Sequence, residues 1–275
     1  MRTRTDWQEQ VGRSWAEMYR QTDRSFAELT RRLVGRIADL PGEAILDIGC
    51  GAGELSLEVA GVRPRAQVVG LDVSPDLVVV AGTRARGLAN LDFAIGDAGT
   101  WRREGFSPDL LVSRHGVMFF DEPVAAFGHL RGQAAPGASL LFSCFRTPRE
   151  NPWMAELAAM LPKDEGVAPP DPHAPGPFAF ADPAHVRGIL EPAGWTGVEF
   201  EAVDYAYVAG ASDDPVADAM AFFSRIGPAA AALHELAGPE RDRVKARIRE
   251  WLEAHRSGGT VAFPAGAWFV SARHG

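Results

Sequence analysis

The sequence predicts an α/β fold built on a doubly wound, mostly parallel sheet, and two observations support this prediction. Apolar runs of strand length alternate with helical patterns between residues 41 and 145, as in sheets with crossover helices. The first run, Ala44 to Ile48, passes through a glycine-rich turn into a helical pattern. Because ligands bind outside the carboxyl ends of such strands, we expect a binding crevice beside this turn.

The expected elements follow the chain in order. Residues 5–38 read as one or two helices, because tryptophans and aliphatic side chains recur there at helical spacing before Pro41-Gly42. Strands are expected at 44–49, 66–71, 91–95, 109–113 and 139–145. Helices are expected at 53–62, from Ser74-Pro75 to about Gly87, and from a cap at Asp121 to Pro136-Gly137.

The pattern changes after Phe145. Residues 146–182 contain a loop dense in proline that ends in a Phe178-Ala179-Phe180 stretch, which favours a lid over a disordered segment. Asp182-Pro183 is typical of a helix start, and residues 195–207 of a strand. Residues 212–256 form a helical insertion with apolar stripes, which are more often core than binding surface.

Composition excludes several classes of protein. The chain has 275 residues, 46% of them hydrophobic and 23% charged, as in ordinary globular proteins. Its net charge of -8 argues against a nucleic-acid surface, which needs clustered cations. Cys50 and Cys144 make neither a disulfide framework nor a metal site, and no histidine pair has metal-ligand spacing. The polar start and the lack of a long apolar run lead us to expect a cytoplasmic protein away from membranes.

The glycine spacing distinguishes between ligand classes. Glycines at 49, 51 and 53 form G-x-G-x-G, whereas a dinucleotide fingerprint requires G-x-G-x-x-G, whose third glycine would fall at position 54. Glu54 stands there, and its carboxylate would repel a pyrophosphate. An acid inside the strand, Asp47, suits a ligand with a cationic or amino end. An NAD(P)-dependent oxidoreductase is therefore the disfavoured alternative.

The stretch Ile45 to Gly53 resembles the first motif of class I S-adenosylmethionine-dependent methyltransferases. The resemblance continues through Val69–Ser74, Gly96–Ala98 and Asp109–His115, in the order and spacing of that family over roughly residues 40–145. It implies a Rossmann-like fold with a late antiparallel strand within 260–272, and S-adenosylmethionine as the cofactor. The small-molecule methyltransferase type is expected, acting on an O, N or C nucleophile.

The resemblance implies a role for each matching residue. Asp72 would accept hydrogen bonds from the ribose, and Asp97 would reach the adenine amino group, although Asp97 also suits a plain turn. An N-terminal aromatic helix would cover the cofactor, but Trp15 and Tyr19 fit core packing equally well. The expected cofactor-binding residues are Trp15, Asp47, Gly49, Cys50, Gly51, Gly53, Asp72, Val73, Asp97, Ala98, Ser113 and Arg114. The expected substrate-lining residues are Tyr19, Trp153, His173 and Phe178.

His115 is the candidate catalytic residue. It follows the fourth expected strand on the crevice side, and an ordinary imidazole titrates near neutrality. Relatives in the family more often carry an apolar aromatic residue there, so either a tuned base or mere packing explains this histidine. His173 in the lid is a weaker second candidate. A non-catalytic cofactor-binding protein is the other alternative, because a fold does not fix function.

One domain is expected to span residues 1–275. Its parts are a helical cover (1–40), a cofactor-binding core (41–145), the proline-rich lid (146–182), and remaining core with the helical insertion (183–275). The partner is expected to be a small-molecule acceptor, with monomer and homodimer both open.

Overall fold

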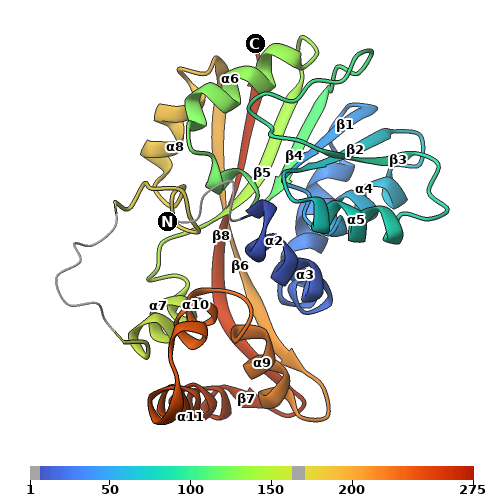
Figure 1. The fold of residues 1–275 in the computed structure, drawn as a ribbon. Helices are drawn as coiled ribbons and strands as arrows, with labels where there is room; N and C mark the ends of the chain where they lie inside the picture. The colour runs from blue at the N-terminus through green and yellow to red at the C-terminus, as the bar shows by residue number, and fades with distance from the viewer. Residues whose placement is uncertain (1–6, 163–170) are drawn as a thin grey trace.

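The computed structural model describes residues 7–162 and 171–275 and contains one twisted mixed sheet (Figure 1). The strand order is β3-β2-β1-β4-β5-β8-β6, and β7 pairs with β8. The strands are β1 (Ala44–Ile48), β2 (Gln67–Asp72), β3 (Leu91–Ile95), β4 (Leu110–Arg114), β5 (Ser139–Phe145), β6 (Trp195–Ala211), β7 (Arg256–Ser257) and β8 (Thr260–His274). Strands β1 to β5 pair in parallel, while β8 runs antiparallel to both β5 and β6. The predicted fold class is confirmed, including the late antiparallel strand.

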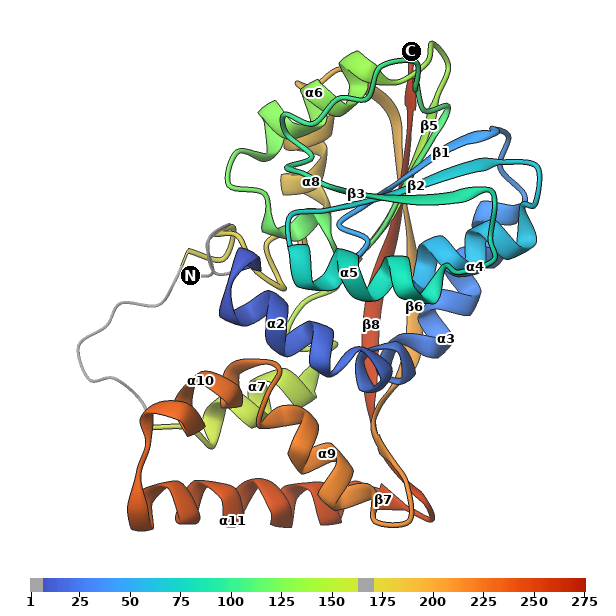
Figure 2. The same cartoon turned by 45° about the vertical axis from the view of Figure 1, so that its right-hand side comes forward.

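Helices cover both faces of the sheet. They are α2 (Gln10–Glu17), α3 (Tyr19–Ala38), α4 (Glu54–Val62), α5 (Pro75–Arg84), η1 (Val117–Phe119), α6 (Pro123–Gln133), α7 (Pro152–Ala159), α8 (Pro183–Leu190), α9 (Pro215–Phe223), α10 (Pro228–Glu235) and α11 (Gly238–Ala254). Figure 2 shows α6 and α8 on one side of the sheet and α3, α4 and α5 on the other. The hydrophobic core fills the space between the sheet and the helices on each of its two faces. Strands β1, β4 and β5 are therefore buried almost throughout.

Local chemistry explains most helix starts. Ser74 Oγ accepts from Leu77 N–H at the start of α5, and Asp182 accepts from Ala184 N–H at the start of α8. The expected cap at Asp121 is wrong, because α6 begins one residue later and its N-cap, Glu122, makes no side-chain cap bond. The fixed φ of Pro123 in the first turn starts this helix instead.

The ribbon formed by β6 and β8 extends beyond the parallel strands and carries the helical insertion. Helices α9, α10 and α11 gather at its far end, with α7 beside α10 (Figures 1 and 2). Helix α7 lies inside the expected proline-rich loop, where Pro152 occupies the first helical turn. Part of that loop, residues 163–170 with Pro169 and Pro170, lies outside the described residues.

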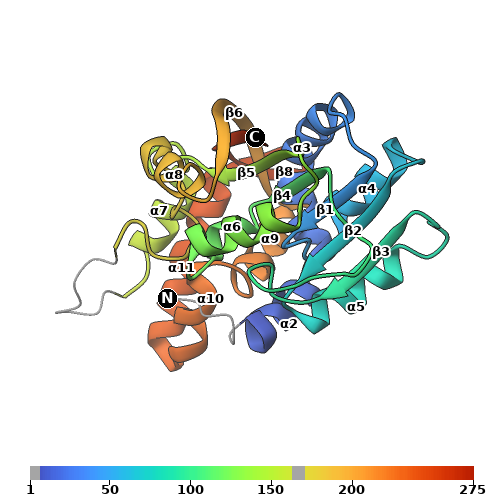
Figure 3. The same cartoon turned by 90° about the horizontal axis from the view of Figure 1, so that it is seen from above.

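Helix α2 lies on α5 (Figure 3). Gly12 makes this approach possible, since a Cβ there would meet Ser74 Oγ at 2.2 Å and Trp7 O at 2.1 Å. No single helix within the described ranges is long and apolar enough to cross a membrane. The bent pair α9–α10, with 77° between its helices, meets that test by length and composition alone.

Candidate active site

A cavity of about 1880 Å³ opens at the carboxyl ends of β1, β2, β4 and β5. It is larger than the roughly 300–1,000 Å³ of a pocket for one small molecule. One arm of the cavity follows the glycine turn between β1 and α4. The other arm runs toward α7, the 171–183 segment and α9. The cavity therefore has room for two molecules side by side.

The glycine turn brings bare backbone to the cavity. Gly49 and Gly51 have φ values of 65° and 57°, a left-handed conformation that favours glycine. A Cβ on Gly49 would lie 2.8 Å from Gly116 Cα, so the turn also packs closely against the segment after β4. The turn is fixed at its start, because the N–H groups of Gly49 and Cys50 both donate to Leu71 O at 2.8 and 3.0 Å.

Asp72 ends β2 with its carboxylate held in a defined orientation. Oδ2 accepts from Gly51 N–H and Oδ1 from Ser74 N–H, each at 2.8 Å. Burial raises the pKa of this carboxyl, and these N–H groups oppose the rise. Each oxygen has a further lone pair, so the carboxylate can accept from two neighbouring hydroxyls.

Asp47 is a buried acid beneath the turn, 1% exposed. Its Oδ2 accepts from Ser56 Oγ at 2.5 Å, but its Oδ1 has no hydrogen-bond partner among the described residues. Burial raises the pKa of this carboxyl to about 7, with the charge of Asp72 adding to the effect. A buried carboxylate of this kind is stabilised by a cationic partner.

The arm beside the glycine turn, where the cofactor is expected, is here called the cofactor arm, and it also contains Asp97, Ala98 and the aromatic cover. Asp97 Oδ1 accepts from Gly99 N–H at 2.8 Å, and both Asp97 and Ala98 line the cavity after β3. Trp15 also lines it, with its ring centroid 5.6 Å from that of Trp7. Tyr19 lies at the start of α3 under the Arg84 guanidinium, 4.8 Å from the ring centroid. Trp15 and Tyr19 therefore line the cavity and also pack against neighbouring side chains.

Arg114 and Glu54 form an ion pair in which each side chain is only 14% exposed. Arg114 lines the cavity, whereas Glu54 points toward Thr30 on α3 and does not line it. The expected repulsion between the Glu54 carboxylate and a ligand phosphate is therefore wrong, because Arg114 neutralises that carboxylate away from the turn. Position 54 still differs from a dinucleotide fingerprint, because it carries the Glu54 side chain where the fingerprint has its third glycine.

Two expected site residues lie behind the cavity wall. Ser113 Oγ donates to Ile48 O at 2.6 Å and accepts from Gly116 N–H at 3.1 Å, which ties the end of β4 to β1. Gly53 caps α4 at φ 85°, and a Cβ there would lie 2.8 Å from Phe93 Cζ. Neither residue lines the cavity; both shape the turn that does.

His115 leaves β4 with φ 61°, a left-handed value that histidine tolerates better than most residues. Its Nδ1 lies 2.8 Å from Ser143 Oγ, and its ring centroid is 4.1 Å from that of Phe145. Nε2 is buried with no partner in the described parts of the chain. Burial, together with the nearby Arg114 charge, lowers the pKa of the imidazole to about 3. The expectation that it titrates near neutrality is therefore wrong, and His115 stands in the cavity wall as a neutral group.

The second arm of the cavity is a chamber of aromatic side chains, here called the aromatic chamber: Phe145, Trp153, Phe178, Tyr207 and Phe223. Trp153 stacks on Tyr207 at 4.2 Å and 11°, and its centroid lies 6.0 Å from that of Phe223. Phe145 lies 6.1 Å from Phe178. His173 is exposed at the outer rim and stacks on His185 at 3.8 Å.

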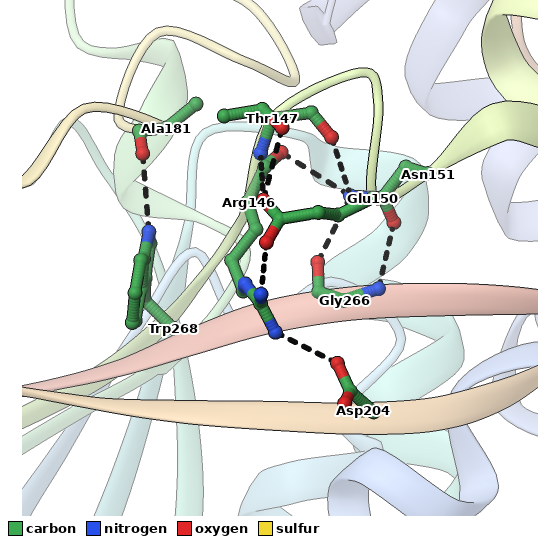
Figure 4. Close-up of polar contacts among 8 residues, drawn as sticks. All are labelled: Arg146, Thr147, Glu150, Asn151, Ala181, Asp204, Gly266 and Trp268. Atoms are coloured by element: carbon green, nitrogen blue, oxygen red, sulfur yellow. Dashed lines mark hydrogen bonds and ion pairs between the residues drawn. The ribbon is translucent and has the colours of Figure 1, made fainter.

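A polar cluster after β5 holds the chamber together (Figure 4). Arg146 pairs with Glu150 and with Asp204 on β6, the latter at 2.7 Å. Asn151, fully buried, donates to Gly266 O at 3.0 Å and accepts from Gly266 N–H at 3.1 Å.

The same cluster fixes two walls of the chamber. Asn151 precedes α7, and its two bonds to Gly266 set this helix, and hence Trp153, against β8. Trp268 Nε1 donates to Ala181 O at 3.0 Å, which holds the segment carrying Phe178 against the same strand (Figure 4).

Sequence reasoning missed several residues that line the cavity. Phe26, Tyr207 and Phe223 come from a helix, a strand and an insertion that are remote in sequence. Their apolar periodicity indicated core packing, and no local motif marks them as site residues. Within the described residues, no group of three or more histidine, cysteine or acidic side chains is arranged to hold a metal ion.

Comparison with known proteins finds similarity to methyltransferases over part of the chain. Residues 39–174 match the family model described as a methyltransferase domain. A trans-aconitate 2-methyltransferase of Methylobacterium radiotolerans is 37% identical over 107 residues, which cover 38% of this chain and 40% of that protein. The chain matches only about half the length of such curated relatives, 57% for the enzyme of Streptomyces avermitilis.

Solved structures share the fold. A methyltransferase described as putative from Bacillus halodurans superposes with a TM-score of 0.56 at 15% identity, covering 89% of this chain and 98% of that one. The cyclase SpnF superposes with a TM-score of 0.52 at 22% identity, covering 90% and 79%. These likenesses concern the fold alone.

Proposed function

We propose that this chain, whose residues 39–174 match the methyltransferase-domain family model, transfers the methyl group of S-adenosylmethionine to a small-molecule nucleophile. When bound, S-adenosylmethionine supplies an activated methyl group on a positively charged sulfur. The protein's own contribution is to bind both molecules, align them and exclude water, and such positioning can account for ~7–11 kcal/mol of rate acceleration.

The observation that carries the proposal is the buried Asp47 carboxylate with its unpartnered Oδ1 beneath the glycine turn. A ligand amino group would supply the missing cationic partner. The bare backbone at Gly49 and Gly51 admits the ligand closely. Two further acids complete the set, with Asp72 to accept from ribose hydroxyls and Asp97 to accept from an adenine amino group. Hydrogen-bond acceptors at these three strand ends match the donors of S-adenosylmethionine.

His115 has a positioning role in this proposal. A group with a pKa of about 3 is a weak general base at neutral pH. The neutral imidazole instead helps shape the junction between the two arms of the cavity, where Phe145 and Phe26 flank it. An acceptor that must lose a proton would then lose it to solvent or after the methyl transfer.

Calorimetry with S-adenosylhomocysteine and NADH, each titrated into the full chain, tests the cofactor. We expect binding of S-adenosylhomocysteine only, and an affinity at least ~tenfold weaker in Asp72→Asn. Asp76→Ala is the matched control, because Asp76 lies close by on α5 but its Arg13 contact of 3.8 Å is exposed. Binding of NADH alone would overturn the proposal.

Transfer of a labelled methyl group separates an enzyme from a binding protein of the same fold. The chain would be incubated with labelled S-adenosylmethionine and a panel of hydroxyl, amine and activated-carbon acceptors. Labelled product supports the proposal. Tight binding of S-adenosylhomocysteine without turnover of any acceptor favours the non-catalytic alternative, because a fold does not fix function.

A further inference from the structure

We infer that the acceptor is a bulky, largely apolar molecule without a negative charge, which binds in the aromatic chamber. This inference rests on the proposed methyltransferase function and concerns the substrate class of the same site. It separates this chain from relatives named for trans-aconitate, which is an anion.

Positive charge is scarce among the described residues that line the cavity. Among the described residues that line it, Arg114 is the single lysine or arginine. Glu54 already neutralises that arginine in a pair with little exposure on either side. An incoming carboxylate would therefore have to displace Glu54, leaving a buried acid without its partner.

Acids, in contrast, line the cavity on every side. Beyond the three acids of the cofactor arm, the lining contains Asp23, Asp121, Glu122, Glu150, Asp171 and Asp182. A carboxylate or phosphate in the chamber would lose its hydration and meet these like charges, and the described lining residues offer no unpaired lysine or arginine to compensate. An uncharged acceptor carries no such penalty.

Several of these acids already have partners. Asp23 pairs with Arg84 at 2.6 Å, Glu150 pairs with Arg146, and Asp182 caps α8. These paired acids therefore stabilise the cavity walls and are not free to bind a ligand. The wall residues His115 and Trp153 each have a polar nitrogen, Nε2 and Nε1, without a partner among the described residues. Both groups are neutral, so neither offers a positive charge to an anionic acceptor.

The lining of the aromatic chamber is apolar. Trp153 stacks on Tyr207 and lies against Phe223, Phe145 packs against Phe178 at 6.1 Å, and all five rings line the cavity. An apolar acceptor would bury apolar area against this lining. A cavity of about 1880 Å³ leaves room for a ring system beside the cofactor.

A matched pair of fluorescent phenols tests the inference. The probes are 7-hydroxy-4-methylcoumarin and 7-hydroxycoumarin-4-acetic acid, which differ by one carboxylate, with trans-aconitate as a third ligand. Binding to the full chain saturated with S-adenosylhomocysteine is measured below the pKa of the phenol. We expect the uncharged coumarin to bind at least ~tenfold more tightly than the acid. Equal or tighter binding of the acid, or of trans-aconitate, would overturn the inference.

Two variants locate the site. Trp153→Ala should weaken binding of the uncharged coumarin at least ~tenfold while leaving S-adenosylhomocysteine affinity within about twofold. Trp101→Phe, at a ring outside the cavity, is the control and should change neither. Unchanged coumarin binding in a folded Trp153→Ala protein would overturn the chamber as the acceptor site. Failure of S-adenosylhomocysteine itself to bind would instead count against the proposed function, so the two failures are distinct.

Discussion

Arg84 on α5 donates to Asp23 on α3 at 2.6 Å, and its other terminal nitrogen donates to Ala52 O in the glycine turn at 2.7 Å. One guanidinium thereby joins the N-terminal helical cover to the turn that forms the cofactor arm. Burial raises the pKa of Asp23, while Arg84 and Arg114 lower it. The position of the cover over the site thus depends on a partly buried ion pair.

Replacing Arg84 by glutamine should loosen the cover. We expect a loss of about 1–3 kcal/mol in the free energy of unfolding, because Asp23 keeps its burial but loses its charged donor. Urea denaturation measures this loss, and calorimetry should show weaker S-adenosylhomocysteine binding. Arg103→Gln is the control, since its pair with Asp92 is exposed and should be worth less than about 1 kcal/mol. Equal effects of the two variants would show that Arg84 is an ordinary surface residue.

The Asp47→Asn variant should be more stable than the wild-type protein at alkaline pH. The carboxyl of Asp47 has a folded-state pKa of about 7, above its usual 3.8, so the folded state binds the extra proton between those values. The free energy of unfolding that this group contributes therefore falls as pH rises from about 4 to about 7. Asparagine removes this loss and keeps an oxygen for the Ser56 hydroxyl.

Thermal unfolding at pH 5 and pH 8 measures the effect. We expect Asp47→Asn to gain roughly 1–4 kcal/mol over the wild-type protein at pH 8, and clearly less at pH 5, where the wild-type acid is mostly protonated. The same variant should bind the cofactor more weakly, because asparagine carries no negative charge for the amino group of the cofactor. Equal stability differences at both pH values would mean that Asp47 titrates normally.

Local chemistry accounts for what could be predicted from the sequence. The turn at Gly49–Gly53, the acid after β2 and the cap at Asp182 each depend on residues within a few positions of one another. The direction of the Glu54 carboxylate could not be predicted in this way, because its partner Arg114 lies 60 residues away in sequence. Arg114 holds the Glu54 carboxylate away from the cavity. The aromatic chamber is predicted only in part, because Trp153 and Phe178 are expected lining residues, whereas Tyr207 and Phe223 join them through contacts that no local pattern encodes.

The His115 imidazole should not titrate between pH 5 and pH 8. Burial lowers its pKa to about 3, below the usual 6.5, so the unfolded state binds more protons between those values. This group therefore favours the folded state above about pH 6.5, and its contribution to the free energy of unfolding is lost as pH falls toward 3. Nuclear magnetic resonance of the histidine ring protons checks this. The His115→Asn variant identifies the resonance and preserves the left-handed backbone, which asparagine also tolerates. A midpoint near 6.5 for that resonance would contradict the prediction and restore His115 as a candidate base.

Asn151→Ala should destabilise the protein and deform the aromatic chamber. The amide of Asn151 is fully buried, and its loss leaves Gly266 N–H and the carbonyls of Arg146 and Gly266 short of a partner. Each unsatisfied buried group costs about 1–3 kcal/mol, so we expect a loss of at least ~2 kcal/mol in the free energy of unfolding by urea denaturation. Thr147→Ala is the matched control, because its hydroxyl bond to Glu150 is exposed and should be worth less than about 1 kcal/mol. Where Asn151→Ala folds, its coumarin affinity should fall while S-adenosylhomocysteine affinity holds, since the cluster positions Trp153 and not the glycine turn. Wild-type stability together with wild-type coumarin affinity would show that α7 is held by its apolar contacts alone.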